Sequence, residues 1–318
     1  MIMQISNTWI ISRLRLLYLT LKTRGVRYTL ARIFRKLYVK LENQLPAREV
    51  LPDIPSSSDI RYHKWLIENY PRKADLHRMV ETVDVLGYKP LISIIMPVYN
   101  PPELFLRKAI ESVLAQVYPY WELCIADDRS TVSYVKSVLE EYSTDARIKV
   151  VFRSENGHIS RASNSALEIA TGEFIALLDH DDLLTPDALY EVVLLLNKHP
   201  EADMIYSDED KVDDNNQIKD PFFKPEWCPD SFLSRMYTCH LGTYRRSLIK
   251  QIGGFRIGFE GSQDYDLVLR VTEKTDKIFH IPKVLYHWRV HSESTATGES
   301  TVKTYAYVAA EKALTEAI

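Results

Sequence analysis

The ten residues 173–182, EFIALLDHDD, join a short apolar segment directly to three aspartates. The segment 173–178 has the length and composition of a β-strand that is buried on both faces, as in a parallel sheet. Asp179, Asp181 and Asp182 follow where this strand ends. Ligands of open parallel sheets bind beyond the carboxyl ends of the strands, so the stretch indicates both a sheet and the place of a site.

Four further β-rich apolar runs accompany this one: LISIIM (91–96), WELCIA (121–126), RIKVVF (147–152) and DMIY (203–206). Helix-length segments lie between them. This alternation predicts an α/β protein with right-handed βαβ crossovers and a Rossmann-like, mostly parallel sheet flanked by helices. The remaining part is less regular, and for it we expect a strand over 237–244, a helix after Asp264, an apolar run over 278–290 and a C-terminal helix over 301–318.

Acidic and polar side chains follow the predicted strands. The segments are PVYN (97–100), DDRS (127–130), DHDD (179–182) and SDED (207–210). Carboxylates gathered at one rim repel one another unless a cation or hydrogen-bond donors lie between them. Asp179 and Asp181 lie on the same side of an extended segment, which suits a hard divalent cation, Mn²⁺ or Mg²⁺. The alternative for an isolated D-x-D is a solvated turn, but the position of this one after a buried strand favours a metal site.

Composition excludes several classes of protein. The 318 residues are 46% hydrophobic and carry a net charge of −3, so the chain as a whole gives no reason to expect a nucleic-acid partner. The three cysteines, Cys124, Cys228 and Cys239, are odd in number and have no CxxC spacing, which argues against a disulfide framework and a zinc site. A reducing, cytoplasmic setting is therefore expected.

The N-terminal part differs from the rest in charge. Residues 1–48 hold ten Lys or Arg and only one acid, Glu42. Within 24–42 the apolar residues recur at helical spacing, which predicts a basic amphipathic helix. Such a helix either lies peripherally on the inner face of an anionic membrane or packs on the body of the protein, and the sequence favours neither. The arginines also interrupt any apolar run long enough to span a membrane.

These segments predict four parts. They are a basic helical extension (1–45), a Pro- and Ser-rich linker with a helical stretch over 60–85 (46–88), a catalytic domain (89–300) and a C-terminal helix (301–318).

The order of the motifs resembles that of family 2 glycosyltransferases. The matching segments are PLISIIMPVYN, WELCIADDRS, NGHISRASNSALEIATGEFIALLDHDDLLTPDAL, YSDEDKVD, GSQDYDLVLR and VLYHWRVHSESTA. They run over residues 88–298, about two-thirds of the chain, and are similar especially to bacterial enzymes that build O-antigens and other surface polysaccharides. The resemblance implies a GT-A fold, a nucleoside-diphosphate-sugar donor and a divalent metal.

The resemblance also implies roles for single residues around the donor. Tyr99 and Asp128 would line the pocket of the nucleotide base, and Asp179 would hold the ribose or the metal. Asp181 would be the metal ligand, while Asp182 orders the turn. From the residues alone, Asp128 can equally be a helix N-cap just beyond its strand.

The remaining roles concern the acceptor and the leaving group. By resemblance, Asp264 is the general base of an inverting transfer; on its own it would be read as a first-turn acid stabilised by the helix dipole. His287 would bind the metal, with His291 as the alternative, and Arg289 would neutralise the diphosphate. The acidic run 207–210 either faces the acceptor or is a solvent-facing loop.

Three functions are weighed. The first is an inverting glycosyltransferase that adds a sugar to a glycan or lipid-linked acceptor in cell-surface polysaccharide synthesis. The second is a nucleotidyltransferase that makes a nucleotide sugar, but such enzymes have a Gly-rich phosphate loop where this chain has PVYNPPE (97–103). The third is a non-catalytic glycan-binding scaffold, against which the presence of both Asp181 and Asp264 speaks.

Overall fold

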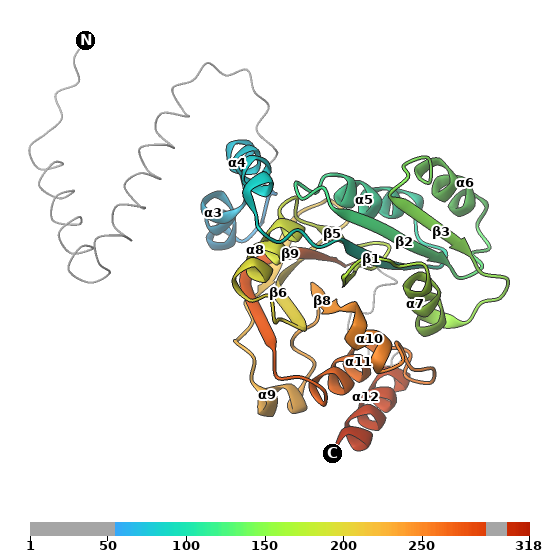
Figure 1. Ribbon diagram of the computed structural model, residues 1–318. Helices are drawn as coiled ribbons and strands as arrows, with labels where there is room; N and C mark the ends of the chain where they lie inside the picture. The colour runs from blue at the N-terminus through green and yellow to red at the C-terminus, as the bar shows by residue number, and fades with distance from the viewer. Residues whose placement is uncertain (1–54, 291–303) are drawn as a thin grey trace, which may run out of the picture. The chain divides into compact units, whose positions relative to one another are not determined.

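The structure is a computed structural model, which describes residues 55–290 and 304–318 (Figure 1). The predictions for the basic helix within 1–45, for the linker up to residue 54 and for His291 lie outside the described residues. Residues 52–318 form one compact unit. Among the described residues, none of the helices is both long enough and apolar enough to cross a membrane.

The described residues build one nine-stranded sheet, whose first half is parallel. Its strands lie in the order β3-β2-β1-β4, and every neighbouring pair is parallel. The bounds are β1 Ile92–Val98, β2 Trp121–Asp127, β3 Ile148–Phe152 and β4 Phe174–Leu177. The helices between them are α5 (Glu103–Leu114), α6 (Ser133–Tyr142) and α7 (His158–Glu168). The βαβ alternation predicted from the sequence is confirmed for this half.

The second half of the sheet is mixed. It continues β4-β8-β6-β9-β5, and β7 pairs with the last part of β6, beyond the part that pairs with β8. Here β6 and β9 are parallel, whereas the β4–β8, β8–β6, β9–β5 and β6–β7 pairs are antiparallel. The bounds are β5 Leu183–Leu184, β6 Met204–Val212, β7 Ile218–Phe222, β8 Gly242–Arg245 and β9 Ile278–Arg289. The strand predicted over 237–244 begins regular pairing only at Gly242, because 237–241 is an irregular segment.

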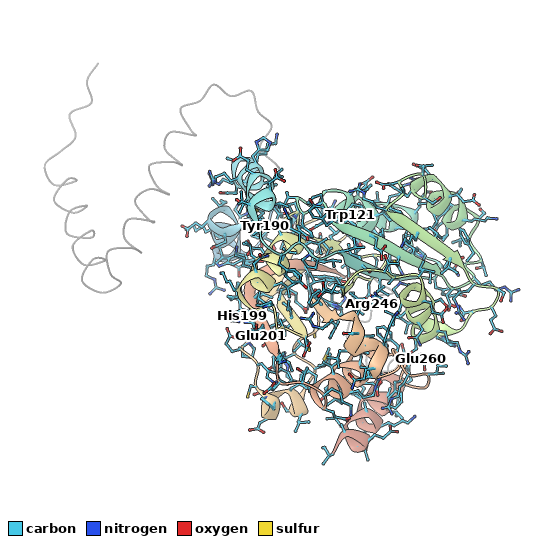
Figure 2. All side chains as sticks on the ribbon, in the orientation of Figure 1. Trp121, Tyr190, His199, Glu201, Arg246 and Glu260 are labelled. Carbon is cyan, nitrogen blue, oxygen red and sulfur yellow. The ribbon has the colours of Figure 1, made fainter. Side chains whose placement is uncertain are left out.

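Apolar side chains cover both faces of the parallel half, so its two central strands are buried except at the half-buried Pro97 of β1. In β2 all seven residues are buried. Helix α5 contributes Leu106, Ile110 and Val113, at the spacing of one helix face, to the core on one side of the sheet. Helix α7 contributes Ala162 to the core on the other side. Side chains fill the space between the sheet and the helices (Figure 2), so the strand ends are held rigidly.

The stretch predicted as helical over 60–85 is two helices, α3 (Ile60–Asn69) and α4 (Lys73–Val85). Asp59 caps α3 by accepting from the backbone N–H groups of its first turn. Pro71 lies between the helices, and the residue before a proline is disfavoured in the helical conformation. The other helices are α8 (Ala188–Lys198), α9 (Pro229–Ser234), α10 (Arg246–Gln251), α11 (Gln263–Thr272) and α12 (Thr304–Ala317).

Strand β6 runs further than predicted. The acidic run 207–210 was expected beyond its end, at the rim or in a solvent-facing loop, and this prediction is wrong. Asp208, Glu209 and Asp210 are buried within β6, at 3%, 5% and 0% exposure. Each has a partner that neutralises or hydrogen-bonds it: His280, Lys224 and Tyr62 respectively. Three consecutive acids look like a surface loop in sequence, and only these partners allow them inside a sheet.

Glu122 in β2 connects neighbouring parts of the parallel half through a hydrogen-bond network. Its carboxylate accepts from Ser93 Oγ at 2.6 Å, Lys149 Nζ at 2.6 Å and the Thr171 backbone N–H at 2.6 Å. Burial by itself would raise the pKa of Glu122, but these hydrogen bonds outweigh it and lower the pKa from 4.5 to about 2. The charged form is therefore the one that the fold stabilises.

This lowered pKa predicts how stability depends on pH. The contribution of Glu122 is fully present above pH 4.5 and is lost as the pH falls towards 2, because the unfolded chain takes up the proton first. A shift of this size corresponds to about 3 kcal/mol. We expect Glu122→Gln to lower the free energy of unfolding at pH 7 by about that amount and to flatten its decline between pH 5 and 2, as measured by urea unfolding. A decline as steep as in the unmodified protein would contradict this assignment.

Candidate active site

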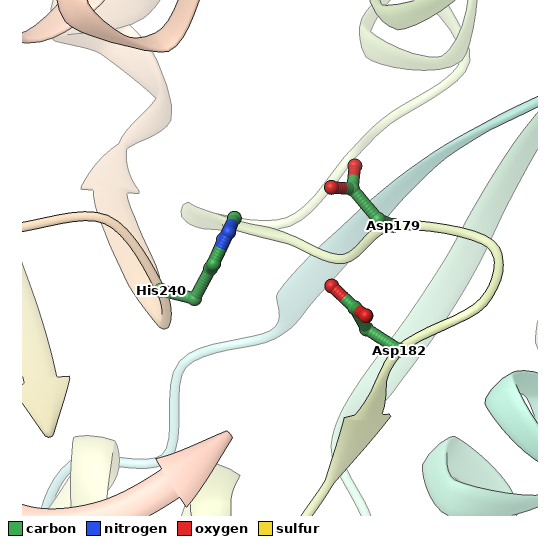
Figure 3. A group of neighbouring side chains, drawn as sticks. All are labelled: Asp179, Asp182 and His240. Carbon is green, nitrogen blue, oxygen red and sulfur yellow. The ribbon is translucent and has the colours of Figure 1, made fainter. Parts of the chain in front are cut away.

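Two aspartates and a histidine meet beyond the end of β4. The ligand atoms of Asp179, Asp182 and His240 all lie within 4.8 Å of one another, and Figure 3 shows the three side chains pointing towards a common space. The aspartates lie in the turn between β4 and β5, and His240 lies in the irregular segment before β8. The carboxylate of Asp179 and the ring nitrogens of His240 accept or donate no hydrogen bond among the described residues, so both are available to a ligand.

Strand β9 holds the turn that carries the aspartates. Asp182 accepts from the Tyr286 hydroxyl and from the Arg289 backbone N–H, each at 2.6 Å. The Asp179 backbone N–H donates to the same Tyr286 hydroxyl at 3.2 Å. The expectation that Asp182 orders this turn is thereby confirmed, and Asp182 also belongs to the three-residue group.

Arg289 lies beneath the turn and is fully buried. Its Nε donates to the carbonyl of Asp181 at 2.7 Å, and its guanidinium lies over the ring of Phe105, 4.4 Å from the centroid. The sequence suggested Arg289 for the diphosphate; in this structure it supports the backbone of the D-x-D segment. The half-buried Asp181 lies next to the three-residue group and not within it.

His287 is placed on the other face of β9 from the group. Tyr286 stacks against the His240 ring, with centroids 4.5 Å apart, and successive residues of a strand face opposite ways. The buried Nδ1 of His287 lies 2.5 Å from the carboxylate of Asp210, while Tyr70 stacks on its ring. Its Nε2 is buried without a hydrogen-bond partner among the described residues. The histidine that the structure brings to the aspartates is His240 and not His287.

Asp264 lies in the first turn of α11, where its Oδ1 accepts from the backbone N–H of Tyr265 at 2.8 Å. Burial raises the pKa of Asp264, and the nearby His240 opposes the rise. Burial also raises the pKa of Asp179, with the charges of Asp181 and Asp264 adding to it. His240 opposes the rise in the pKa of both aspartates, and Asp264 adds to that of Asp179, so the three residues share one electrostatic environment although separate segments carry them.

The pKa of Asp182 is raised for the same physical reasons. Burial raises its pKa well above the ordinary value, and the charges of Asp181 and Asp179 raise it further. A divalent cation would reverse this effect, because it favours the charged form of every carboxylate around it. Carboxylate oxygens suit Mg²⁺ and Mn²⁺, and an imidazole nitrogen is a common ligand of first-row transition metals, so the donor set is compatible with a divalent cation such as Mn²⁺.

Asp128 lies at the end of β2 and is 2% exposed. It accepts from Arg153 Nε at 2.7 Å and from the backbone N–H of Gly157 at 3.0 Å. Gly157 directly precedes α7, whereas the residue that precedes α6 is Val132. Asp128 therefore does not cap the helix after its own strand, and it ties the end of β2 to the start of α7.

Tyr99 lies at the end of β1 and is 46% exposed, so its ring is free to contact a ligand. The next residue, Asn100, fastens this loop to the one after β2. Its side-chain oxygen accepts from the Thr131 backbone N–H at 2.7 Å, and its own N–H donates to Ser130 Oγ at 2.9 Å. The predicted convergence of these two strand ends is thus built from specific hydrogen bonds.

His240 is the site residue that sequence reasoning missed. It lies in TCHLGT (238–243), which has neither a D-x-D pattern nor a histidine motif. Its only local signal was a histidine within the strand predicted over 237–244, and a lone histidine is usually structural.

Residues 93–253 match the family described as Glycosyl transferase family 2. The chain is 38% identical over 258 residues to the O-antigen biosynthesis protein RfbC of Myxococcus xanthus, covering 81% of this chain and 20% of that protein.

Two solved structures share the fold. One is S. aureus TarS 1–349 in complex with UDP-GlcNAc, with a TM-score of 0.57 and 21% identity over 69% of this chain and 64% of that one. The other is the mannosyltransferase PcManGT from Pyrobaculum calidifontis in complex with GDP-Man and Mn²⁺, with a TM-score of 0.52 and 19% identity over 69% and 66%. The predicted GT-A fold is confirmed by this likeness.

The match to curated relatives covers only part of each. The chain spans 27%, 20% and 30% of the length of three of them.

Proposed function

This chain belongs to glycosyl transferase family 2, and we propose on that basis that it transfers a sugar from a nucleoside diphosphate to the hydroxyl group of a glycan or lipid-linked acceptor. The observation that carries the proposal is the meeting of Asp179, His240 and Asp264. The charge of Asp264 adds to the raised pKa of Asp179, and His240 opposes the rise in both, which supports a cation site and a carboxylate base close to one another. Transfer to a hydroxyl needs both functions at one place.

The cation site is proposed to consist of Asp179 and His240, with Asp182 and the neighbouring Asp181 completing the negative charge. When bound, the cation would neutralise charge on the diphosphate. Tyr286 and Arg289 contribute by holding the turn, because the Asp182 carboxylate is fixed by both of them. Asp128 and Tyr99 are proposed to line the base pocket at the ends of β2 and β1, where the two loops are fastened together.

Asp264 is proposed as the general base of an inverting reaction. Its carboxylate takes the proton of the acceptor hydroxyl while that oxygen forms a bond to the anomeric carbon. The bond from the anomeric carbon to the phosphate oxygen breaks on the opposite side, and the nucleoside diphosphate leaves with the electron pair. A carboxylate whose pKa is raised by burial, as that of Asp264 is, accepts this proton more readily than an ordinary one.

The donor and acceptor classes are proposed from the relatives. TarS and PcManGT were solved with UDP-GlcNAc and GDP-Man, and a curated relative is named for O-antigen biosynthesis. We therefore propose a nucleoside-diphosphate sugar as donor and a cell-surface polysaccharide as the product. The family membership, together with Asp264 beside Asp179, favours this function over a nucleotidyltransferase or a glycan-binding scaffold.

A ligand screen tests the proposed function. We expect one class among UDP-, dTDP- and GDP-sugars to raise the thermal unfolding temperature of the protein, and to do so only with Mn²⁺ or Mg²⁺. At a hundred times the dissociation constant, binding would add about 2.7 kcal/mol to the free energy of unfolding. Calorimetric titration of the stabilising pair gives the affinity. Absence of any stabilisation by these donors with either metal would reject the proposed function.

A further inference from the structure

Lys224 is a fully buried lysine whose ammonium lies behind the proposed metal site. Its side chain is 0% exposed. Nζ donates to Glu209 Oε2 at 2.9 Å, to the carbonyl of Thr238 at 2.8 Å and to the carbonyl of His240. All three N–H bonds of the ammonium are thereby used. Its backbone N–H in turn donates to Asp208 at 2.8 Å, so both ends of the residue are tied to β6.

Glu209 holds the same segment from the other side. The oxygen that accepts from Lys224 also accepts from the backbone N–H of His240, at 2.9 Å. Both backbone polar groups of His240 are therefore bound by the Lys224–Glu209 pair. The next residue is held too, because the Leu241 N–H donates to Ser207 Oγ at 3.2 Å.

The segment needs such support because it precedes β8 and has no strand pairing of its own. A buried ion pair is weak evidence for stability, since well-packed apolar side chains of similar volume are often as good or better. What this pair does provide is a fixed position for a backbone that carries the His240 ring. A metal ligand must be held within a few tenths of an ångström, and the residues that orient ligands commonly affect metal affinity.

We propose that Lys224, through its ion pair with Glu209, is a positioning residue that places His240 for divalent-metal binding. The inference rests on the proposed function, because that function supplies the metal site. The inference extends the proposed function because it gives a role to the buried charges of Lys224 and Glu209, which contact neither the metal nor the substrate. The pair acts on the backbone of His240, so its removal changes the placement of the ring and leaves the Asp182 carboxylate and the Asp179 backbone where β9 holds them.

Mn²⁺ titration of five variants tests this role. The binding of Mn²⁺, alone and with UDP or GDP, is measured by the electron paramagnetic resonance of the free ion, which needs no turnover. Lys224→Met removes the ammonium and leaves Glu209 unpaired, so the double variant Lys224→Met/Glu209→Gln is measured beside it. Lys149→Met is the matched control, because Lys149 pairs with the buried Glu122 between β3 and β2 and has no contact with His240. The fourth variant combines Lys224→Met with His240→Ala, and is compared with His240→Ala alone.

We expect the dissociation constant of Mn²⁺ to rise about tenfold or more in Lys224→Met and in the double variant, and to stay within about twofold in Lys149→Met. Adding Lys224→Met to His240→Ala should cause no further loss, because the lysine acts only through the histidine. A folded Lys224→Met or double variant with unchanged affinity overturns the positioning role while the metal site stands. Equal loss in the His240→Ala background overturns it as well. Absence of Mn²⁺ binding to the unmodified protein rejects the metal site itself, and the positioning role with it.

Discussion

Asp264→Asn is expected to lower kcat by about 100- to 10,000-fold, because a positioned general base contributes that much to proton transfer. The amide has nearly the shape of the carboxylate and can still accept from the Tyr265 N–H through its oxygen, so the start of α11 should keep its structure. Donor binding does not use the base, and the dissociation constant of the donor with Mn²⁺ should therefore change little. Steady-state kinetics and calorimetric titration measure the two quantities separately.

Asp266 provides the matched control for this variant. It lies two residues further along α11, is 1% exposed and is bound by Arg256 Nε at 2.9 Å and Arg270 Nε at 3.0 Å. Asp266→Asn weakens these ion pairs, so the protein should unfold at lower temperature while the folded fraction keeps its kcat. Full activity of Asp264→Asn, or equal loss of activity in both variants, would contradict the role of Asp264 as base.

Asp179→Asn is expected to abolish metal-dependent activity, with a loss of at least about 100-fold in kcat/KM, because it removes one charge from the group that would hold the cation. The stabilisation of the protein by Mn²⁺ with a nucleotide should disappear in the same variant. Thermal unfolding with and without Mn²⁺ measures this without turnover. In the absence of metal the variant should be at least as stable as the unmodified protein, since burial and like charges already raise the pKa of Asp179.

The comparison for Asp179 is Asp203→Asn. Asp203 binds Arg245 at 2.9 Å and Thr275 at 2.7 Å just before β6, away from the three-residue group. Its replacement should lower stability without changing the effect of Mn²⁺. Asp181→Asn is measured in parallel. Comparison of its Mn²⁺ stabilisation with that of Asp179→Asn shows which aspartate of D-x-D contributes more to metal binding. Unchanged Mn²⁺ stabilisation in Asp179→Asn would remove Asp179 from the site.

The parallel half of the fold was predictable because its signals are local. A strand buried on both faces is mostly apolar, and β1, β2 and β4 are, with few polar residues such as Ser93 and Glu122. Helix-length segments between such strands leave few alternatives to βαβ units. The acids after β4 were predicted as site residues from their place after a buried strand, whereas Asp264 was predicted as one from the resemblance to family 2 glycosyltransferases.

The mixed half gave weaker signals. The bounds of β6 and β8 were misjudged because their burial depends on partners far along the chain, such as His280 for Asp208 and Tyr62 for Asp210. A row of three acids has no apolar pattern, and a strand of this kind is recognisable only when the groups that neutralise it are known. Likewise, the sequence showed that His287 and Arg289 lie in the apolar run 278–290, but it did not show which face of β9 each side chain occupies.

The sequence by itself determined the parallel strands, the positions of the acidic turns at their carboxyl ends and the family to which the chain is similar, because each of these depends on contiguous residues. Only the tertiary structure decided that His240 joins Asp179 and Asp182, that His287 turns to Asp210, and that Lys224 and Glu209 hold the histidine segment. These are contacts between segments that are distant in sequence. These contacts form only when β6, β8 and β9 pack against one another, and no local pattern of residues determines that packing.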